Sequence, residues 1–472
     1  MSGPVIVWFR NDLRLSDHPA LEAASGRPVV PVHIWSPDEE GEWRQGAASR
    51  WWLHHSLVAF DADLRRRGSR LILRRGPASA ALARLVKETE AVAVHWHRRH
   101  EPWAAAQERS VMSELRAVGC EVRVFAGRLL ADPETFLNAS GRPFQVFTPF
   151  YRALVQRLTA AEPSVGSFAP DRMQGATSRL ASASIGELGL LPTVSWDDGL
   201  RRAWTPGEAG AHLRLQRFLA GAVQDYAERR DRPDLDGVSR LSPHLHFGEI
   251  SPRQVWHAAH AIPGAEPFLR QLAWREFSYH LLHHFPHTPD APLRPEFASF
   301  PWRSDRHGLR AWQRGQTGYP IVDAGMRQLW SEGWVHNRVR MLVASFLTKD
   351  LLIPWQDGAR WFWDTLVDAD LANNTQGWQW TAGCGADAAP YFRVFNPVTQ
   401  GMKFDPDGAY VRRWIPELAR MPSEWIHRPW EAPVQTLADA GVRLGVTYPE
   451  AIVDHAFARD RALQAYHRIA RR

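Results

Sequence analysis

Residues 4–130 alternate short apolar runs with amphipathic segments, and this alternation limits the folds that the chain can adopt. Segments with helical periodicity separate the apolar runs, which cover residues 5–9, 29–35, 70–76, 91–97 and 121–127. Runs of this length are typical of buried strands. Strands that alternate with helices form a parallel sheet with helices on its faces. We therefore expect a doubly wound, Rossmann-like domain over residues 1–130.

The rest of the chain divides into a linking segment and a helical region. Residues 131–200 are rich in Ser, Ala, Gly and Pro, so we expect a connection that belongs to neither domain. From residue 201 to residue 472 the periodicity is mostly helical. A chain of 472 residues, 44% of them hydrophobic, can bury two cores. The predicted fold class is α/β plus all-α.

Composition narrows the class of partner only in part. The net charge is +6, and Lys87, Lys349 and Lys403 are the only lysines among 57 basic residues. Arginine suits phosphate, so nucleic acid is an admissible partner, but the codons of a GC-rich genome produce the same bias. Cys120 and Cys384 are the only cysteines, and the first apolar run is too short for a signal peptide or a membrane span. We expect a cytoplasmic protein with no membrane segment.

The segment "LVDADLANNTQGWQW" (366–380) is the first candidate for a ligand site. It places Asp368, Asp370 and Asn374 in an apolar region, where carboxyl and amide groups need hydrogen-bond partners. Asp368 and Asp370 are two residues apart and would point to different faces of a helix. A turn around a polar ligand is therefore the better interpretation.

Two more segments carry polar groups, and the sequence allows two interpretations of each. Ser239 and Ser242 precede a helix that starts near Pro243; they could cradle a phosphate, although a helix cap that binds nothing is commoner. Gln271, Trp274 and neighbouring polar residues share one helix face, which fits a pocket or a half-buried surface equally well. The histidines between residues 280 and 287 lack a metal-binding motif, so we predict no metal.

Motifs along most of the chain resemble one known family, the photolyases and cryptochromes. In the family's order, from about Pro4 to Leu418, stand "VIVWFRNDLRLSDHPAL", "SRLSPHLHFGEISPRQV", "AWREF", "HNRVRM", "WFWDTLVDADLANN", "GWQW" and "NPVTQGMKF". The chain looks most like bacterial cyclobutane pyrimidine dimer photolyases, and "SRWWLHHSL" is similar to their class III branch.

This resemblance implies light-driven DNA repair. Reduced FAD in the helical domain would donate an electron to a cyclobutane pyrimidine dimer flipped out of UV-damaged DNA, and would split it. Such a lyase needs no proton-transfer pair, which agrees with the lack of acid–base motifs. A cryptochrome-type blue-light photoreceptor and a (6-4) photolyase are the alternatives, and we expect a monomer.

The resemblance also assigns the contacts of FAD. Asp370 would bond the pyrimidine edge of the flavin, Asp368 would pair with Arg340, and Asn374 would face flavin N5. Val238 stands where the family usually has Thr, so one hydroxyl contact is lost. The full expected set is Tyr226, Val238, Ser239, Arg240, Leu241, Ser242, Arg275, Asn337, Arg340, Asp368, Ala369, Asp370 and Asn374.

A second set of residues matches the family's lesion pocket. Gln271 stands where dimer photolyases usually have Glu, and some (6-4) enzymes have Gln there. Asn337 and Met341 stand where (6-4) enzymes have a histidine pair, so we favour the cyclobutane dimer. The full expected set is Gln271, Trp274, Arg275, Asn337, Arg338, Met341, Trp380 and Gln400.

Three tryptophans match the family's electron relay. Trp378, Trp355 and Trp302 would carry electrons from the surface to oxidised FAD, and with Asn374 they are the expected catalytic residues. For an antenna pigment, the resemblance to the class III branch favours 5,10-methenyltetrahydrofolate, and Glu39 or Glu40 would contact it. A deazaflavin, or no antenna, is the alternative.

Overall fold

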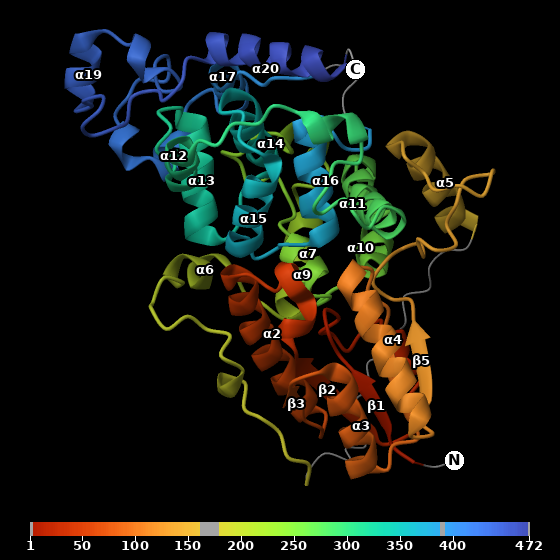
Figure 1. The fold of residues 1–472 in the computed structure, drawn as a ribbon. Coiled ribbons are helices and arrows are strands. Elements are labelled where there is room, and N and C mark those ends of the chain that lie inside the picture. Colours follow the sequence, from red (N-terminus) through yellow and green to blue (C-terminus); the bar gives the residue numbers. More distant parts are fainter. Residues whose placement is uncertain (1–2, 161–178, 388–391, 471–472) are drawn as a thin grey trace.

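A computed structural model describes residues 3–160, 179–387 and 392–470 and contains two domains (Figure 1). The sheet domain comprises five strands with helices α1–α4, and the helical domain comprises α5–α20. Among the described residues, no helix is long and apolar enough to cross a membrane. The predicted pairing of a parallel-sheet domain with a helical domain is confirmed.

The sheet is parallel throughout, with strand order β3-β2-β1-β4-β5. In the register of the central strand, Val5 pairs with Val29 of β2 and with Ala93 of β4. The order reverses between β1 and β4, so the connections that follow these two strands lead to opposite faces of the sheet, and ligands of open parallel sheets bind at such a point. The strands are β1 (Val5–Trp8), β2 (Val29–Trp35), β3 (Ile72–Arg75), β4 (Ala93–His97) and β5 (Glu121–Phe125).

Helices cover both faces of this sheet, as expected for buried parallel strands. Val5 and Val7 of β1 pack in a core with α2, while Ile6 and Trp8 pack in a second core with α3 and α4. The first core extends into the helical domain through Phe247 and other residues, so α2 lies at the domain boundary. The helices are α1 (Pro19–Glu22), α2 (Ala47–Arg66), α3 (Ala78–Thr89) and α4 (Pro102–Ala117).

The helical domain has two main cores, one around α5, α7, α10 and α11 and one around α12–α16, α18 and α20. Its helices are α5 (Phe147–Ala160), α6 (Asp198–Ala203), α7 (Glu208–Leu219), α8 (Tyr226–Arg229), α9 (Ser242–His246), α10 (Pro252–Ala259), α11 (Glu266–His284), α12 (Arg306–Arg314), α13 (Pro320–Glu332), α14 (Asn337–Ser345), α15 (Trp355–Thr365), α16 (Leu371–Ala382), α17 (Pro397–Phe404), α18 (Ala409–Trp414), α19 (Val434–Ala440) and α20 (His455–Ala470).

Two segments differ from the sequence-based expectation. Residues 131–200 contain α5, whose Phe150 and Leu154 pack in one core with residues of α11. The helix forms because "FTPFYRALVQRL" has apolar residues at helical spacing, although Pro and Gly surround this segment. The polar segment 366–380 is a turn only up to Asp370, which caps the N-terminus of α16. Residues 161–178 of the expected connection lie outside the described residues.

Candidate functional site

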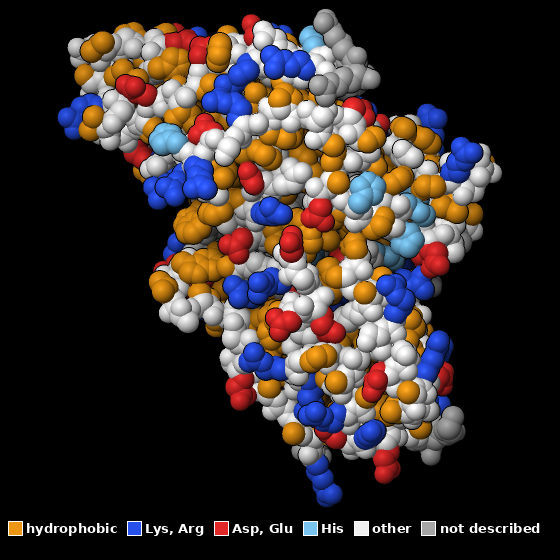
Figure 2. Space-filling view, in the orientation of Figure 1, with side chains coloured by type: hydrophobic (Ala, Val, Ile, Leu, Met, Phe, Trp, Pro, Cys, Tyr) orange, Lys and Arg blue, Asp and Glu red, His pale blue; other side chains and the backbone are white. Residues whose placement is uncertain are grey.

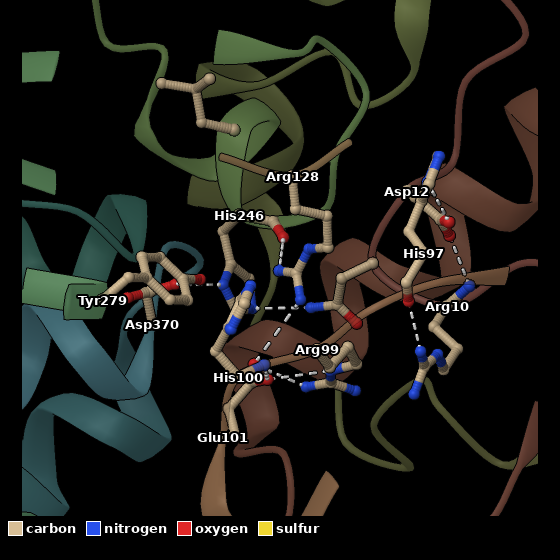
Figure 3. Close-up of polar contacts among 12 residues, drawn as sticks. Arg10, Asp12, His97, Arg99, His100, Glu101, Arg128, His246, Tyr279 and Asp370 are labelled. Carbon is tan, nitrogen blue, oxygen red and sulfur yellow. Dashed lines mark hydrogen bonds and ion pairs between the residues drawn. The ribbon is translucent and has the colours of Figure 1, made fainter. Parts of the chain in front are cut away.

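Asp370 is the centre of a buried polar cluster at the domain boundary (Figure 3). Its carboxylate accepts from the Tyr279 hydroxyl, from His246 Nδ1 at 3.4 Å, and from the backbone and side-chain amides of Asn373 at 2.9 and 2.7 Å. Burial alone would raise the pKa of Asp370, but His246, the Arg275 charge and Tyr279 together lower it. Asp370 is therefore an ionised cap that fixes the start of α16.

Asp368 lies next to this cap and has a different environment. Arg340 Nη2 donates to Asp368 Oδ2 at 2.7 Å, while Arg340 Nε donates to the Val335 carbonyl at 2.8 Å. Asp368 Oδ1 is buried and accepts no hydrogen bond from the described residues. A buried acceptor without a donor is costly, so this oxygen fits a ligand that brings an N–H or O–H group.

Asn374 lies on the first turn of α16, half-buried. Its side-chain nitrogen donates to the carbonyl of Ala359 on α15 at 3.0 Å. This bond uses one of the two amide N–H groups and leaves the other N–H and Oδ1 for a ligand. Asp368 and Asn374 therefore each offer an acceptor oxygen, and these acceptors fit the N–H groups of a flavin ring.

The loop before α9 is held by an arginine between two tryptophans. Arg240 has a left-handed backbone (φ 51°), and its guanidinium lies 4.5 Å from the ring centroids of both Trp204 and Trp334. Its Nη2 pairs with Glu332 at 2.8 Å. Trp334 Nε1 also donates to Ser242 Oγ at 3.3 Å. The Arg240 side chain thus anchors the loop. The Leu241 amide donates to Ser239 Oγ at 3.4 Å, and the hydroxyl hydrogens of Ser239 and Ser242 can meet a phosphate.

The remaining residues expected to contact a cofactor lie around this loop. Val238 packs at the edge of both neighbouring cores, and Leu241 and Ala369 are buried. Tyr226 is buried with its ring edge-on to Phe218 and Phe268, each with a centroid distance of 5.7 Å. None of these contacts was visible in the sequence, because the partners are 8 to 42 positions away.

Trp274 on α11 is stacked against a residue that the sequence did not indicate. Its ring lies parallel to that of Phe147 on α5, with centroids 3.7 Å apart and an interplanar angle of 6°. Phe147 therefore covers one face of Trp274. Gln271, one turn earlier, is half-buried, and its Nε2 donates to the Pro267 carbonyl at 3.4 Å. Its Oε1 is left to accept from a ligand.

The other residues expected at a lesion lie on α14, α16 and α17. Asn337 is exposed, with Nδ2 3.9 Å from the Met341 sulfur. Arg338 pairs with Asp231 at 2.9 Å. Trp380 Nε1 donates to the Asp387 carbonyl at 3.2 Å, and Gln400 is half-buried on α17.

The three relay tryptophans differ in depth. Trp378 and Trp355 are each 2% exposed, and Trp302 is half-buried. Trp378 packs against α15, where a Cβ on Gly358 would lie 2.1 Å from its ring, so only glycine allows this approach. Trp355 begins the same helix, one turn earlier. Trp378 also contacts Phe362, with a centroid distance of 5.0 Å.

The sheet domain contains a pocket at the carboxyl ends of β1, β2 and β4. Aromatic and polar side chains line it: Trp8, Trp35, Trp103, Arg10, Asn11, Glu40, Gln45, Arg99 and Gln107. Glu40 accepts from the Gln45 amide at 3.0 Å, and burial raises the pKa of its carboxyl to about 7. Glu39 does not line the pocket; it accepts from the Ala78 amide and from Gln107, both at 2.9 Å.

Charged residues connect this pocket to the Asp370 cluster (Figure 3). Arg99 pairs with Glu101 at 2.9 Å, and Arg128 lies 3.8 Å from the same carboxylate. Arg128 then donates to the His246 carbonyl at 3.4 Å, and Arg275 donates to the Arg128 carbonyl at 3.3 Å. Removing these charged side chains from water is unfavourable, and the ion pairs between them offset that cost.

Histidine side chains gather beside α11 (Figure 2). His280 accepts from the Phe144 amide at 2.9 Å, and His284 bonds the Pro133 carbonyl at 2.9 Å. Among the described residues, these histidines form no group of three possible metal ligands; the one such group, with its ligand atoms within 4.8 Å of each other, is Asp12, His18 and His97. Asp12 lies 2.8 Å from His97 Nδ1 and 3.4 Å from His18 Nε2, so imidazole N–H donors account for its geometry.

Sequence reasoning missed His246, Tyr279, Phe147 and Asn11. Tyr279 follows Arg275 by four residues and shares its helix face, so periodicity could have indicated it. Asn11 follows β1 at the point where strand order reverses, a place where ligands bind in open α/β sheets. His246 and Phe147 carry no such signal.

Comparisons with known proteins agree on one family. Residues 5–167 match the DNA photolyase family, and residues 268–468 match the FAD-binding domain of DNA photolyase. The chain is 49% identical to a deoxyribodipyrimidine photo-lyase of Agrobacterium fabrum over 98% of both chains. It is 39% identical to Cryptochrome-1 of Arabidopsis thaliana over 97% of this chain and 69% of that protein. A solved bacterial class III photolyase from Agrobacterium tumefaciens superposes with a TM-score of 0.96, at 48% identity, over 100% of this chain and 98% of that one. The chain belongs to the photolyase/cryptochrome family.

Proposed function

We propose that this protein is a deoxyribodipyrimidine photolyase that splits cyclobutane pyrimidine dimers in DNA under light. The observation that carries the proposal is the buried, unpaired acceptor Asp368 Oδ1, together with the half-buried Asn374 amide and the Arg340–Asp368 ion pair. When bound in reduced form, FAD supplies the electron that opens the dimer. The chain's own residues then have to hold that cofactor, exclude water and position the lesion.

Three groups would hold FAD. Asp368 and Asn374 accept from the flavin ring, and Arg340 keeps Asp368 in place. The loop of residues 238–242 meets the phosphates with its hydroxyls and amides. Tyr279, His246 and Asn373 already donate hydrogen bonds to the Asp370 carboxylate, so its first role is to stabilise the start of α16. A direct hydrogen bond from the pyrimidine edge of the flavin to Asp370 stays a prediction.

The lesion would lie between residues of α11, α14, α16 and α17. Trp274 presents one free face to a flipped base, since Phe147 covers the other. Stacking on an aromatic ring is worth roughly 1 to 3 kcal/mol per base. Gln271 offers an acceptor, and Asn337 and Met341 form the wall that favours the cyclobutane dimer over the (6-4) product. Arg275, Arg338, Trp380 and Gln400 complete the proposed set.

Trp378, Trp355 and Trp302 are proposed to supply electrons to oxidised FAD. Trp378 and Trp355 are buried and Trp302 is half-buried, which supports a path from the interior to the surface. The path is needed only to regenerate the reduced cofactor.

The pocket in the sheet domain is proposed to bind 5,10-methenyltetrahydrofolate as an antenna. Trp35 and Trp103 offer faces for a flat heterocycle, and Glu40 offers a buried carboxyl that can bond its N–H groups. Of Glu39 and Glu40, only Glu40 lines this pocket, which supports Glu40 as the contact. A deazaflavin is the alternative occupant.

Repair of defined lesions tests the proposal. Purified protein is incubated with duplex DNA that carries either a cyclobutane dimer or a (6-4) product, under blue light and in the dark. We expect light-dependent loss of the cyclobutane dimer and release of FAD on denaturation. Bound FAD with repair of neither lesion would instead support a photoreceptor, and repair of only the (6-4) product would overturn the assignment of Asn337 and Met341.

A further inference from the structure

A buried hydrogen-bond chain runs from the sheet domain to Asp370. Asn11, which follows β1, has Nδ2 3.3 Å from His246 Nε2, and His246 Nδ1 lies 3.4 Å from Asp370 Oδ2. Asn11 is 3% exposed and His246 is 5% exposed. Water therefore has little access to these bonds, and each imidazole nitrogen faces one protein partner.

The geometry of this chain fixes which nitrogen carries the proton. An amide nitrogen can only donate, so Asn11 Nδ2 makes His246 Nε2 an acceptor. The proton of a neutral imidazole then lies on Nδ1 and points at the Asp370 carboxylate. Asn11 thus determines the direction of the bond that His246 makes to Asp370.

The backbone around Asn11 is held tightly against the His246 segment. Leu13 N donates to the Phe247 carbonyl at 3.1 Å, and Arg14 Nη1 donates to the Gly248 carbonyl at 3.0 Å. Gly248 has φ 64°, and a Cβ there would lie 2.3 Å from the Asn11 carbonyl oxygen. A larger residue at position 248 would separate the two segments, so the contact between Asn11 and His246 is built into the fold.

We propose that Asn11 is a positioning residue for the flavin site: it holds His246 as the Nδ1–H tautomer, which orients Asp370 and, through it, the start of α16. The part of this inference that concerns flavin rests on the proposed function. The tautomer itself is a property of this chain alone. Asn11 acts through His246 and touches neither flavin nor lesion.

The test combines nitrogen NMR with FAD affinity in the FAD-containing protein and its stripped form. Protein labelled with ¹⁵N-histidine gives the His246 signals by difference from His246→Gln. We expect the Nδ1–H tautomer in the wild type and its loss in Asn11→Asp, where an acceptor replaces the donor at nearly equal volume. Asn11→Ala should raise the FAD dissociation constant about two- to tenfold, the equivalent of one hydrogen bond. Ser16→Ala, which removes hydrogen bonds to Gln254 and Glu208 across the same boundary, should leave the FAD affinity unchanged.

The FAD affinity of a double variant distinguishes this role from a general loss of structure. In the His246→Gln background, Asn11→Ala should have no further effect on FAD affinity, because the two residues act in one chain. Full additivity, or an Nε2–H or doubly protonated His246 in the wild type, would overturn the proposal. Wild-type protein that keeps the Nδ1–H tautomer but binds no FAD would instead refute the proposed function.

Discussion

Replacing Glu40 by Gln should stabilise the protein at alkaline pH. Glu40 lines the pocket of the sheet domain, and burial raises the pKa of its carboxyl from the ordinary 4.5 to about 7. The folded chain therefore retains a proton on Glu40 at pH values where the unfolded chain has lost it. Stability then falls as pH rises from 4.5 to 7 and becomes constant above 7, because both states are ionised there.

The magnitude follows from the two pKa values. One unit of difference corresponds to about 1.4 kcal/mol, so the full effect is about 3 kcal/mol. Part of it is already present at pH 5, and between pH 5 and pH 8.5 the advantage of Glu40→Gln should grow by about 2 to 3 kcal/mol. The amide keeps an acceptor for the Gln45 N–H at nearly the same volume, so packing contributes little to this difference.

Urea unfolding at several pH values measures the effect. Glu42→Gln is the matched control, since its carboxyl is two residues away and 82% exposed, and its effect should not change with pH. If the stability of Glu40→Gln relative to the wild type is the same at pH 5 and pH 8.5, the argument from burial is wrong. In the same variant, folate affinity should fall, because the amide offers one acceptor oxygen in place of two.

Three other changes test the proposed repair site. Trp302→Phe should slow photoreduction of oxidised FAD, followed by absorbance, while repair by chemically pre-reduced protein persists; equal loss of both would make Trp302 structural. Phe147→Leu removes the ring stacked on Trp274 and should weaken lesion binding about two- to tenfold, and unchanged binding in a gel-shift assay would contradict a role for the stack. Gln271→Glu should retain or improve repair of the cyclobutane dimer, by tenfold at most, and a shift toward the (6-4) product would reverse the lesion assignment.

The fold was predictable because it depends on local periodicity. Each strand of the sheet domain is a short apolar run in the sequence, and the alternation with helices fixes a parallel arrangement. Helix α5 was missed because its apolar spacing stands among Pro and Gly residues, and its partners on α11 are more than 100 positions away. Tertiary packing decided that segment.

The sequence predicts which residues belong to the site, but it does not predict which residues they bond. The sequence identifies Asp368, Asp370 and Asn374 as buried polar groups that need an explanation. It does not show that Tyr279 and His246 already satisfy Asp370, which leaves Asp368 with the unpaired oxygen. Hydrogen bonds between residues 91 to 124 positions apart have no local signature.

The contacts that join residues 11–17 to residues 246–253 bear on how this chain could be recombined with its relatives. Asn11, Arg14 and Asp17 all bond that second segment. A chimaera that takes its sheet domain from one protein and its helical domain from another would combine these two segments from different parents. Several buried polar groups would then lose their hydrogen-bond partners. The exchangeable unit is therefore the sheet domain together with the segment from His246 to Arg253, although more than 100 residues separate them in the sequence.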